Sequence, residues 1–256
     1  MATALITGAR GLLGSAICHL LPPDLTAVVV DRAEHDLLRP GAGTELVRSV
    51  RPDLVLHLAW CASGTPGYRT DADNERWVEA TKELTIAARA AGAHCFVTGS
   101  AVDNGPPQDA YSAAKCRLRE LLASDIAGET VTWLRPFYVV SPEAGRPQLV
   151  RLALEATRSG EPVTLQTPDS RHDFVHVFDV ARGVIAAITH HLSGTVDIGS
   201  GQLRSVHALV SALGASWRAN QLHSPDPLHH YLAAETTALT DVGWRPYATE
   251  ELFGHG

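Results

Sequence analysis

The sequence predicts an α/β fold of the Rossmann type, a doubly wound parallel sheet followed by a small C-terminal lobe. Three observations predict this fold. β-prone and helical segments alternate through the first half of the chain, a pattern typical of a parallel sheet with helices on both faces. Glycines at positions 8, 11 and 14 stand between the first β-prone segment and the first helical one. The second β-prone segment ends in an acid, Asp31.

The first two segments form a unit that can bind a dinucleotide. "ATALITGARGLLGSAICHLL" passes from a strand through a glycine turn into a helix, which Pro22-Pro23 ends. Backbone N–H groups and the positive end of such a helix face a pyrophosphate, and glycines permit the tight turn and close packing. "TAVVVDR" then forms a second strand ending at Asp31, about twenty residues after the glycines, where an acid binds the adenine ribose.

Cofactor choice stays open between NAD and NADP, with NAD favoured. The carboxylate of Asp31 would repel a 2′-phosphate, which favours NAD. Arg10 in the glycine turn and Arg32 after Asp31 could instead pair with that phosphate, because arginine–phosphate contacts are strong.

The following elements keep the alternation. We expect strands at 52–60, 93–101 and 130–136, and helices at 74–92 and 110–124. Ligands of such sheets bind beyond the carboxyl ends of the strands. The glycine turn, the strand end at Thr98–Ser100 and Tyr111 on the next helix converge on that edge.

The stretch "DAYSAAK", 109–115, places Tyr111 and Lys115 four residues apart. On a helix these positions share one face. The chain contains two lysines, Lys82 and Lys115. At this spacing the two residues are either a pair on an ordinary helix surface or a catalytic pair. In the second case the ammonium would lower the pKa of the phenol toward neutrality.

Composition excludes several other classes. The chain has 256 residues, of which 45% are hydrophobic and 19% charged, values typical of a soluble globular protein. A net charge of −7 argues against nucleic acid as the main ligand, and no apolar run approaches the ~20 residues of a membrane span. We expect no membrane or nucleic-acid partner, and a cytoplasmic protein, because no signal-peptide pattern is present.

The cysteines and histidines do not indicate a metal. The four cysteines have no Cys-x-x-Cys spacing and lie in apolar or helical contexts, so we expect reduced thiols. The histidine pairs lack a surrounding framework of cysteine or carboxylate ligands, and we therefore predict no metal site.

Several motifs in order resemble the extended short-chain dehydrogenase/reductases, in the nucleotide-sugar epimerase/dehydratase branch. The resemblance extends over nearly the whole chain. The matching segments are Thr7 to Gly14 with Gly-x-x-Gly-x-x-Gly spacing, His57-Leu58-Ala59, Tyr111 to Lys115, "RHDFVHVFDVARGV" (171–184), "VDIGSG" (196–201) and "DVGWRP" (241–246).

The resemblance implies a set of site residues. Tyr111 would exchange a proton with a sugar oxygen as hydride moves to or from the nicotinamide, Ser100 would hydrogen-bond that oxygen, and Lys115 would also reach the nicotinamide ribose. The substrate contacts are Ser100, Tyr138 and Arg171, the last as a clamp on the diphosphate. The cofactor contacts are Gly8, Arg10, Gly11, Leu12, Leu13, Gly14, Asp31, Arg32, Asp36, Leu58, Ala59, Trp60, Tyr111, Lys115 and Pro136. Asp173 and Asp179 are expected to cap or pair rather than to do chemistry.

The sequence also departs from the family pattern. Tyr111 follows Ser100 by only eleven positions, with a loop about half the usual length. Ala101-Val102 stands where sugar 4,6-dehydratases have an Asp-Glu pair, so dehydration is disfavoured because it needs a second acid and base. Trp77 stands where many relatives have an asparagine.

Three functions remain. We favour an NAD(P)-dependent ketoreductase that acts on a nucleotide-activated deoxysugar at C4, with Tyr111 as the general acid. A nucleotide-sugar 4-epimerase would use the same residues, and a non-catalytic dinucleotide sensor would keep only the fold. The resemblance implies a nucleotide-diphosphate sugar as substrate, and we expect a homodimer.

We expect two domains. Residues 1–140, with 172–199 returning to them, would form the dinucleotide-binding domain. Residues 141–171 and 200–256 would form the small substrate-binding lobe.

Overall fold

The computed structural model describes residues 1–61, 67–220 and 232–254. By its internal contacts the chain divides into two compact units. The first unit comprises 1–136 and 181–196, and the second comprises 137–180 and 197–256.

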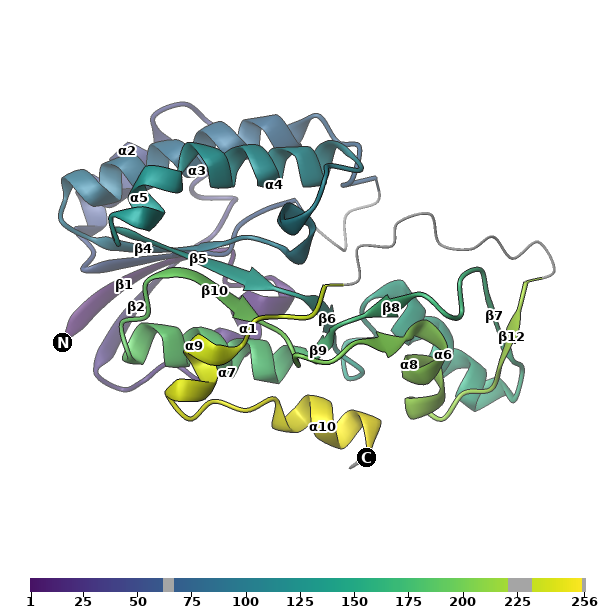
Figure 1. Ribbon diagram of the computed structural model, residues 1–256. Coiled ribbons are helices and arrows are strands. Elements are labelled where there is room, and N and C mark those ends of the chain that lie inside the picture. The colour runs from purple at the N-terminus through teal and green to yellow at the C-terminus, as the bar shows by residue number, and fades with distance from the viewer. Residues whose placement is uncertain (62–66, 221–231, 255–256) are drawn as a thin grey trace. The chain divides into compact units, whose positions relative to one another are not determined.

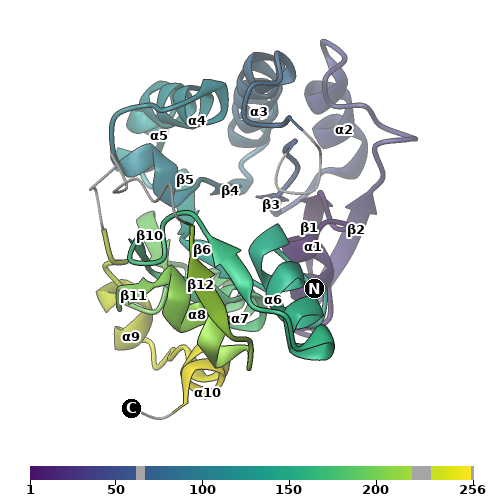
Figure 2. The same ribbon diagram turned by 90° about the vertical axis from the view of Figure 1, so that its right-hand side faces the viewer.

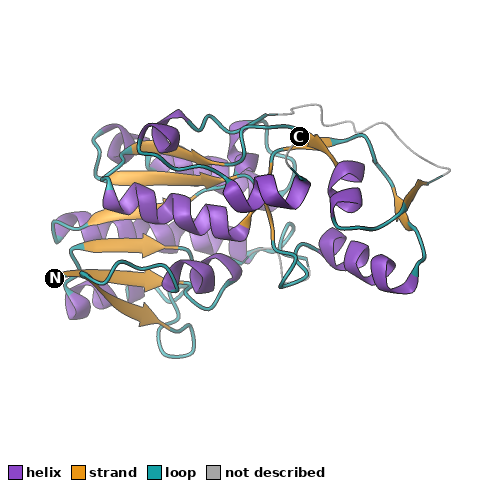
Figure 3. Cartoon of the chain, turned by 90° about the horizontal axis from the view of Figure 1, so that it is seen from below, coloured by secondary structure: helices purple, strands orange, loops and turns teal. Residues whose placement is uncertain are grey.

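The first unit is built on a six-stranded sheet with strand order β10-β5-β4-β3-β1-β2. The pairs β1–β2, β1–β3, β3–β4 and β4–β5 are parallel, and Figure 3 shows these strands running in one direction. The strands are β1 (Ala2–Thr7), β2 (Leu25–Val30), β3 (Leu54–His57), β4 (His94–Thr98), β5 (Val131–Pro136) and β10 (Gly194–Ile198). The predicted α/β fold with a parallel sheet is confirmed.

Helices cover both faces of this sheet (Figures 1 and 2). Helices α2 (Ala42–Val50), α3 (Asp73–Ala90), α4 (Ala110–Leu121) and α5 (Ala123–Ala127) lie on one face, and α1 (Leu12–Cys18) and α7 (Val177–Thr189) on the other. The predicted helices at 74–92 and 110–124 correspond to α3 and α4. Helix α2, over 42–50, was not predicted from the sequence.

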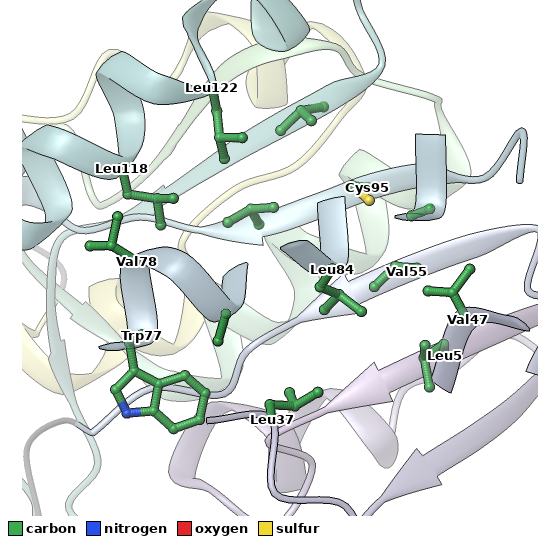
Figure 4. Close-up of a cluster of buried hydrophobic side chains, with 14 of the residues drawn as sticks. Leu5, Leu37, Val47, Val55, Trp77, Val78, Leu84, Cys95, Leu118 and Leu122 are labelled. Atoms are coloured by element: carbon green, nitrogen blue, oxygen red, sulfur yellow. The ribbon is translucent and has the colours of Figure 1, made fainter. Parts of the chain in front are cut away.

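The main core lies between the sheet and helices α2, α3 and α4 (Figure 4). Alternate side chains of the strands meet helix side chains there, as the period of two along a strand requires. Trp133 on β5 is fully buried. Burial of such apolar surface is the main favourable term in folding. The larger side chains of the cluster include Leu5, Val55, Trp77, Val78, Leu84, Leu118, Leu122 and Trp133.

Among its described residues, the second unit contains three two-stranded sheets. They pair β6 (Tyr138–Val140) with β9 (Phe174–His176), β7 (Val163–Leu165) with β12 (Trp217–Ala219), and β8 (Arg171–His172) with β11 (Arg204–Ser205). Its helices are α6 (Gln148–Ser159), α8 (Val206–Ala212), α9 (Thr237–Asp241) and α10 (Tyr247–Phe253). Within the described residues no helix combines the length and apolar character needed to cross a membrane.

Two buried carboxylates organise the second unit. Asp173 accepts hydrogen bonds from Ser200 N at 2.6 Å, Gly201 N at 2.9 Å and Ala234 N at 2.9 Å. Asp179 accepts one from Thr249 N at 2.7 Å, near the start of α10. A carboxylate at a helix start satisfies N–H groups that the helix leaves unpaired. Asp179 therefore has the capping role expected of it, whereas Asp173 holds backbone N–H groups of non-helical segments.

Asp173→Ala is expected to destabilise the protein by about 3 kcal/mol or more, because it leaves one buried and two part-buried N–H groups without an acceptor. The free energy of unfolding measured in urea is the test. Asp169→Ala, at a side chain that is 78% exposed, is the control and should change stability by less than about 0.5 kcal/mol. Equal effects of the two substitutions would contradict the role given to Asp173.

Candidate functional site

The site lies at the carboxyl ends of β1, β3 and β4. Thr7, the last residue of β1, pairs with His57 at the end of β3, and His57 pairs with Val97 on β4. The side chains of Thr7 and His57 are also hydrogen-bonded, at 2.7 Å between Oγ1 and Nδ1. The segments that follow these three strands therefore leave the sheet side by side.

The glycine turn follows β1 and packs backbone against backbone. Gly8 has φ +74°, and a Cβ there would lie 2.6 Å from Ala59 N. A Cβ on Gly14 would lie 2.2 Å from Gly8 O. Gly11 precedes α1 as its N-cap, and its N–H donates to Gly8 O at 3.0 Å. The turn is thus possible only with glycine at 8 and 14, and Arg10 and Gly11 remain exposed.

Other residues of the predicted cofactor set lie next to this turn. Leu12 and Leu13, the first residues of α1, are half-buried. Leu58 donates its N–H to Thr7 O at 3.1 Å, and Ala59 packs against Gly8. The structure therefore brings the glycine turn and the 58–60 segment together.

The acids after β2 are engaged locally. Asp31 accepts a hydrogen bond from Ala33 N at 2.9 Å and forms an ion pair with Arg10, whose side chain is 82% exposed. Arg32 and Asp36 form an exposed ion pair at 3.7 Å. Asp31 and Arg10 thus meet, as a shared site near the glycine turn requires, whereas Arg32 faces Asp36.

Ser100 follows β4 and caps the short helix η1 (Ala101–Asn104). Its backbone N–H donates to Asp103 Oδ2 at 3.1 Å, and its side-chain oxygen accepts from Val102 N at 3.5 Å. The carboxylate of Asp103 is completely buried. It also accepts from Trp133 Nε1 at 3.0 Å and from Arg135 Nε at 2.9 Å. Both donors lie on β5, so the Ser100 turn is tied to the sheet.

Tyr111 lies in the first turn of α4, whose N-cap is Asp109. Its N–H donates to Arg69 O at 3.1 Å, and Arg69 forms an ion pair with Asp109 at 2.6 Å. The ring of Tyr68 meets the Tyr111 ring edge to face, with centroids 5.2 Å apart. Burial raises the pKa of Tyr111 to about 12, although a hydrogen bond with Ser100 acts in the opposite direction. Ser100 and Tyr111 are thus brought together.

Lys115, one helical turn further, is buried, with 2% of its surface exposed. Its Nζ donates to Thr98 O at 2.8 Å and lies 3.5 Å from the ring centroid of Trp60. Nζ is 6.0 Å from the ring centroid of Tyr111. Burial lowers the pKa of Lys115 to about 7, with the charge of Asp103 acting in the opposite direction.

The expected effect of Lys115 on Tyr111 is wrong for this structure. The pKa of the phenol is raised rather than lowered, because burial penalises the phenolate. The charge of Lys115 instead adds to burial in lowering the pKa of His57 to about 3. The shared helix face was predicted correctly, but the lysine side chain turns toward Trp60 and the end of β4.

The remaining predicted residues lie at strand ends. Pro136 ends β5 and is buried. In the second unit, Tyr138 is 41% exposed, with its ring centroid 4.1 Å from that of His172. Arg171 is exposed, and its Nη2 donates to Leu203 O at 2.9 Å.

Sequence reasoning missed Asp103, Arg135 and Tyr68. Asp103 carried one usable signal, since an acid three residues after a serine fits a capping box. Arg135 sits in an otherwise apolar strand, where a charge requires a partner. Tyr68 offered no signal, because it lies outside any helix or strand and its contact with Tyr111 spans 43 positions of the chain.

Comparison with protein families gives one match over most of the chain. The profile of the NAD dependent epimerase/dehydratase family matches residues 4–199. No curated protein sequence matches the chain.

Solved structures share the fold over nearly the whole chain. ADP-L-glycero-D-manno-heptose-6-epimerase from Helicobacter pylori has TM-score 0.76 and 22% identity, over 96% of this chain and 91% of that one. UDP-glucose 4-epimerase from Thermotoga maritima, in complex with UDP-glucose, has TM-score 0.78 and 19% identity, over 98% and 96%. GDP-mannoheptose C4 reductase from Campylobacter jejuni, with NADP bound, has TM-score 0.75 and 18% identity, over 96% and 93%. At these identities the likeness establishes the Rossmann-type fold.

The buried lysine predicts how stability changes with pH. The pKa of Lys115 is about 7 in the folded chain against an ordinary value of 10.5. The unfolded state therefore binds more protons between these values, and the free energy of unfolding rises with pH across that window. Lys115→Met should remove this rise, which amounts to on the order of 4 kcal/mol.

The measurement is urea unfolding of the parent and the variant from pH 6 to pH 10.5. The variant should be the more stable protein at pH 6, and the two should converge as pH rises. Lys82→Met, at an exposed side chain, is the control and should run parallel to the parent. Parallel curves for Lys115→Met as well would refute the low pKa.

Proposed function

This chain belongs to the NAD dependent epimerase/dehydratase family, and we propose that it is an NAD(P)-dependent ketoreductase acting on a nucleotide-activated deoxysugar at C4. The observation that carries this proposal is the meeting of Ser100, Tyr111 and Lys115 at the carboxyl end of β4. The family match supports an enzyme that uses a nicotinamide dinucleotide. The reaction type and the position on the sugar are part of this proposal.

The residues of the glycine turn fit a dinucleotide. Backbone packing fills the space a Cβ would need at Gly8 and Gly14, while Gly11 leaves its backbone exposed in front of α1. The carboxylate of Asp31 at the end of β2 would hold the adenine ribose, with Leu58 and Ala59 beside the turn. Thr98 Oγ1 is buried and has no hydrogen-bond partner among the described residues. When bound, the nicotinamide would supply the hydride.

The protein's own groups would handle the proton and the oxygen. The Tyr111 hydroxyl would give its proton to the carbonyl oxygen of the sugar, and the Ser100 hydroxyl would donate a hydrogen bond that orients this oxygen. The ammonium of Lys115, held at the end of β4, would reach the nicotinamide ribose. Asp103 would hold Ser100 in place through the backbone N–H.

A protonated Tyr111 fits the reductase, although a 4-epimerase would use the same residue in turn as base and as acid. With a pKa of about 12 the phenol carries its proton at neutral pH, and reduction of a ketone requires a proton donor. A 4-epimerase begins by oxidising a hydroxyl, which requires a base. In the structures named above the family fold serves both reactions, since one is described as a C4 reductase with NADP and others as epimerases.

Consumption of added cofactor separates the candidate functions. The enzyme is incubated with nucleotide-activated 4-keto-6-deoxysugars and either NADH or NADPH, and absorbance at the wavelength of the reduced nicotinamide is followed. A reductase consumes one cofactor per product, whereas a 4-epimerase interconverts nucleotide sugars without consumption. A non-catalytic sensor binds the cofactor but neither consumes it nor converts a nucleotide sugar. Mass spectrometry of co-purified ligand would direct the choice of nucleotide.

Tyr111→Phe is expected to bind cofactor with unchanged affinity and to lose at least about 100-fold in turnover, the usual scale for general acid–base catalysis. Cofactor affinity is measured by tryptophan fluorescence and turnover by the absorbance assay. Tyr247→Phe, at a ring that is 57% exposed on α10, should behave as the parent. Near-parental turnover of Tyr111→Phe would exclude this tyrosine as the acid.

Asp31→Ala is expected to lose NAD affinity and to gain NADP affinity relative to NAD. Hydrogen bonds to a carboxylate contribute about 1.5–3 kcal/mol each, so the ratio of affinities should move at least about tenfold. The substitution also releases the exposed Arg10 to pair with a 2′-phosphate.

Titration of both cofactors against parent and variant measures that ratio. Asp24→Ala, at an exposed acid before β2, is the matched control and should leave the ratio unchanged. A parent that already prefers NADP strongly would show that Asp31 is not the ribose ligand.

A further inference from the structure

The ammonium of Lys115 lies in a defined position, its seat, which is formed by the ring of Trp60 and the carbonyl of Thr98. Its Nζ lies 3.5 Å from the ring centroid of Trp60 and donates to Thr98 O at 2.8 Å. A cation within about 6 Å of an aromatic ring centroid is attracted by the negative face of the ring, most strongly in tryptophan. Because Lys115 is 2% exposed, water does not screen this attraction.

Other side chains fix the orientation of the Trp60 ring. Trp60 Nε1 donates to Asn74 Oδ1 at 3.0 Å. Asn74 is fully buried, and its amide nitrogen donates to Tyr68 O at 2.6 Å and Asp71 O at 2.9 Å. Trp77 stacks on Trp60 with ring centroids 6.1 Å apart and planes at 28°. A ring held in this way presents the same face to the lysine before any ligand arrives.

We propose that Trp60 is a positioning residue for Lys115, and that its indole face and the Thr98 carbonyl together hold the ammonium at the end of β4. The seat itself does not depend on the reaction. Its importance for turnover rests on the proposed function, because it requires Lys115 to be catalytic.

The groups that face Lys115 define what a titration will report. They are His57 on β3, Asp103 on η1 and Tyr111 on its own helix, α4. His57 is neutral above its pKa of about 3, and Tyr111 is neutral below its pKa of about 12. Between these values Lys115 titrates beside two neutral groups and the carboxylate of Asp103.

The composition of the chain makes this contact measurable. Its lysines are Lys82 and Lys115, so protein labelled with ¹³C at the lysine ε-carbon gives two signals. Lys82→Arg removes one of them and assigns the other. Protons above an aromatic ring are shifted upfield, and we expect this displacement for the ε-protons of Lys115 and not for those of the exposed Lys82.

Two substitutions separate the ring face from the rest of Trp60. Trp60→Leu and Trp60→Phe both lose the hydrogen bond to Asn74, but the phenylalanine variant keeps an aromatic face. Trp60→Leu should lower the titration midpoint of Lys115 by about 0.5 to 1.5 pH units, since the ammonium loses its cation–π partner. Trp60→Phe should keep more than half of the upfield displacement and shift the midpoint by less than half as much.

Three results would overturn the proposal: no upfield displacement in the parent, an unchanged or raised midpoint in Trp60→Leu, or equal shifts in the two variants. The parent spectrum decides the question even if Trp60→Leu does not fold, which the Lys82 signal reports. In turnover, the loss of activity at high pH should move to lower pH by the same amount as the midpoint.

The two proposals fail separately. A seated lysine with no shift of the pH–rate profile would remove the catalytic role of Lys115 and leave the seat intact. A parent protein that consumes neither NADH nor NADPH with the 4-keto-6-deoxysugars would remove the proposed function and leave the spectra unchanged.

Discussion

A buried ammonium needs compensation from inside the fold, and the residues around Lys115 are arranged to provide it. Removal of this charge from water costs several kcal/mol unless polar partners replace the solvent. The carbonyl of Thr98 and the face of Trp60 contact the ammonium directly. The carboxylate of Asp103 acts through its charge and is itself paired with Arg135. Two cations share one carboxylate, and the compensation is therefore incomplete, consistent with a pKa of about 7.

The same burial sets the state of the neighbouring groups. His57 is neutral because burial and the charge of Lys115 both oppose its protonation. It can therefore serve as a neutral hydrogen-bond link between Thr7 on β1 and Thr81 on α3. Tyr111 keeps its proton because its phenolate would be poorly solvated. At this edge of the sheet, burial thus favours the uncharged forms of His57 and Tyr111. The phenol of Tyr111 is therefore suited to give a proton.

The sequence predicted those parts of the fold that depend on local pattern. The alternation of segments, the glycine spacing and the i, i+4 pair Tyr111–Lys115 all follow from periods and turns. The prediction of a tight glycine turn has a steric basis, because a Cβ at Gly8 or Gly14 collides with backbone. Helix α2 was not predicted because the segment before it, 31–41, is rich in charged residues and resembles an extended loop.

The direction of a side chain could not be predicted in the same way. The spacing of Tyr111 and Lys115 fixes a shared helix face, but the lysine stem is long enough to reach either the phenol or Trp60. Its choice depends on a contact between residues 55 positions apart, and on Asn74, which orients the indole ring. Such contacts leave no periodic trace in one sequence. The roles given to Asp31, Tyr138 and Arg171 also remain predictions, since no ligand contact defines them.

The short Ser100–Tyr111 segment gains its order from the same charges. Ser100 begins η1, Asp103 ties that turn to Trp133 and Arg135 on β5, and Asp109 caps the helix that carries Tyr111. Each end of the segment is therefore anchored by a carboxylate with several donors, an arrangement stronger than neutral hydrogen bonds would give. A catalytic group must be held close to its productive geometry by its surroundings. A longer loop between Ser100 and Tyr111 would need further contacts to order it, whereas here the carboxylates of Asp103 and Asp109 fix the segment.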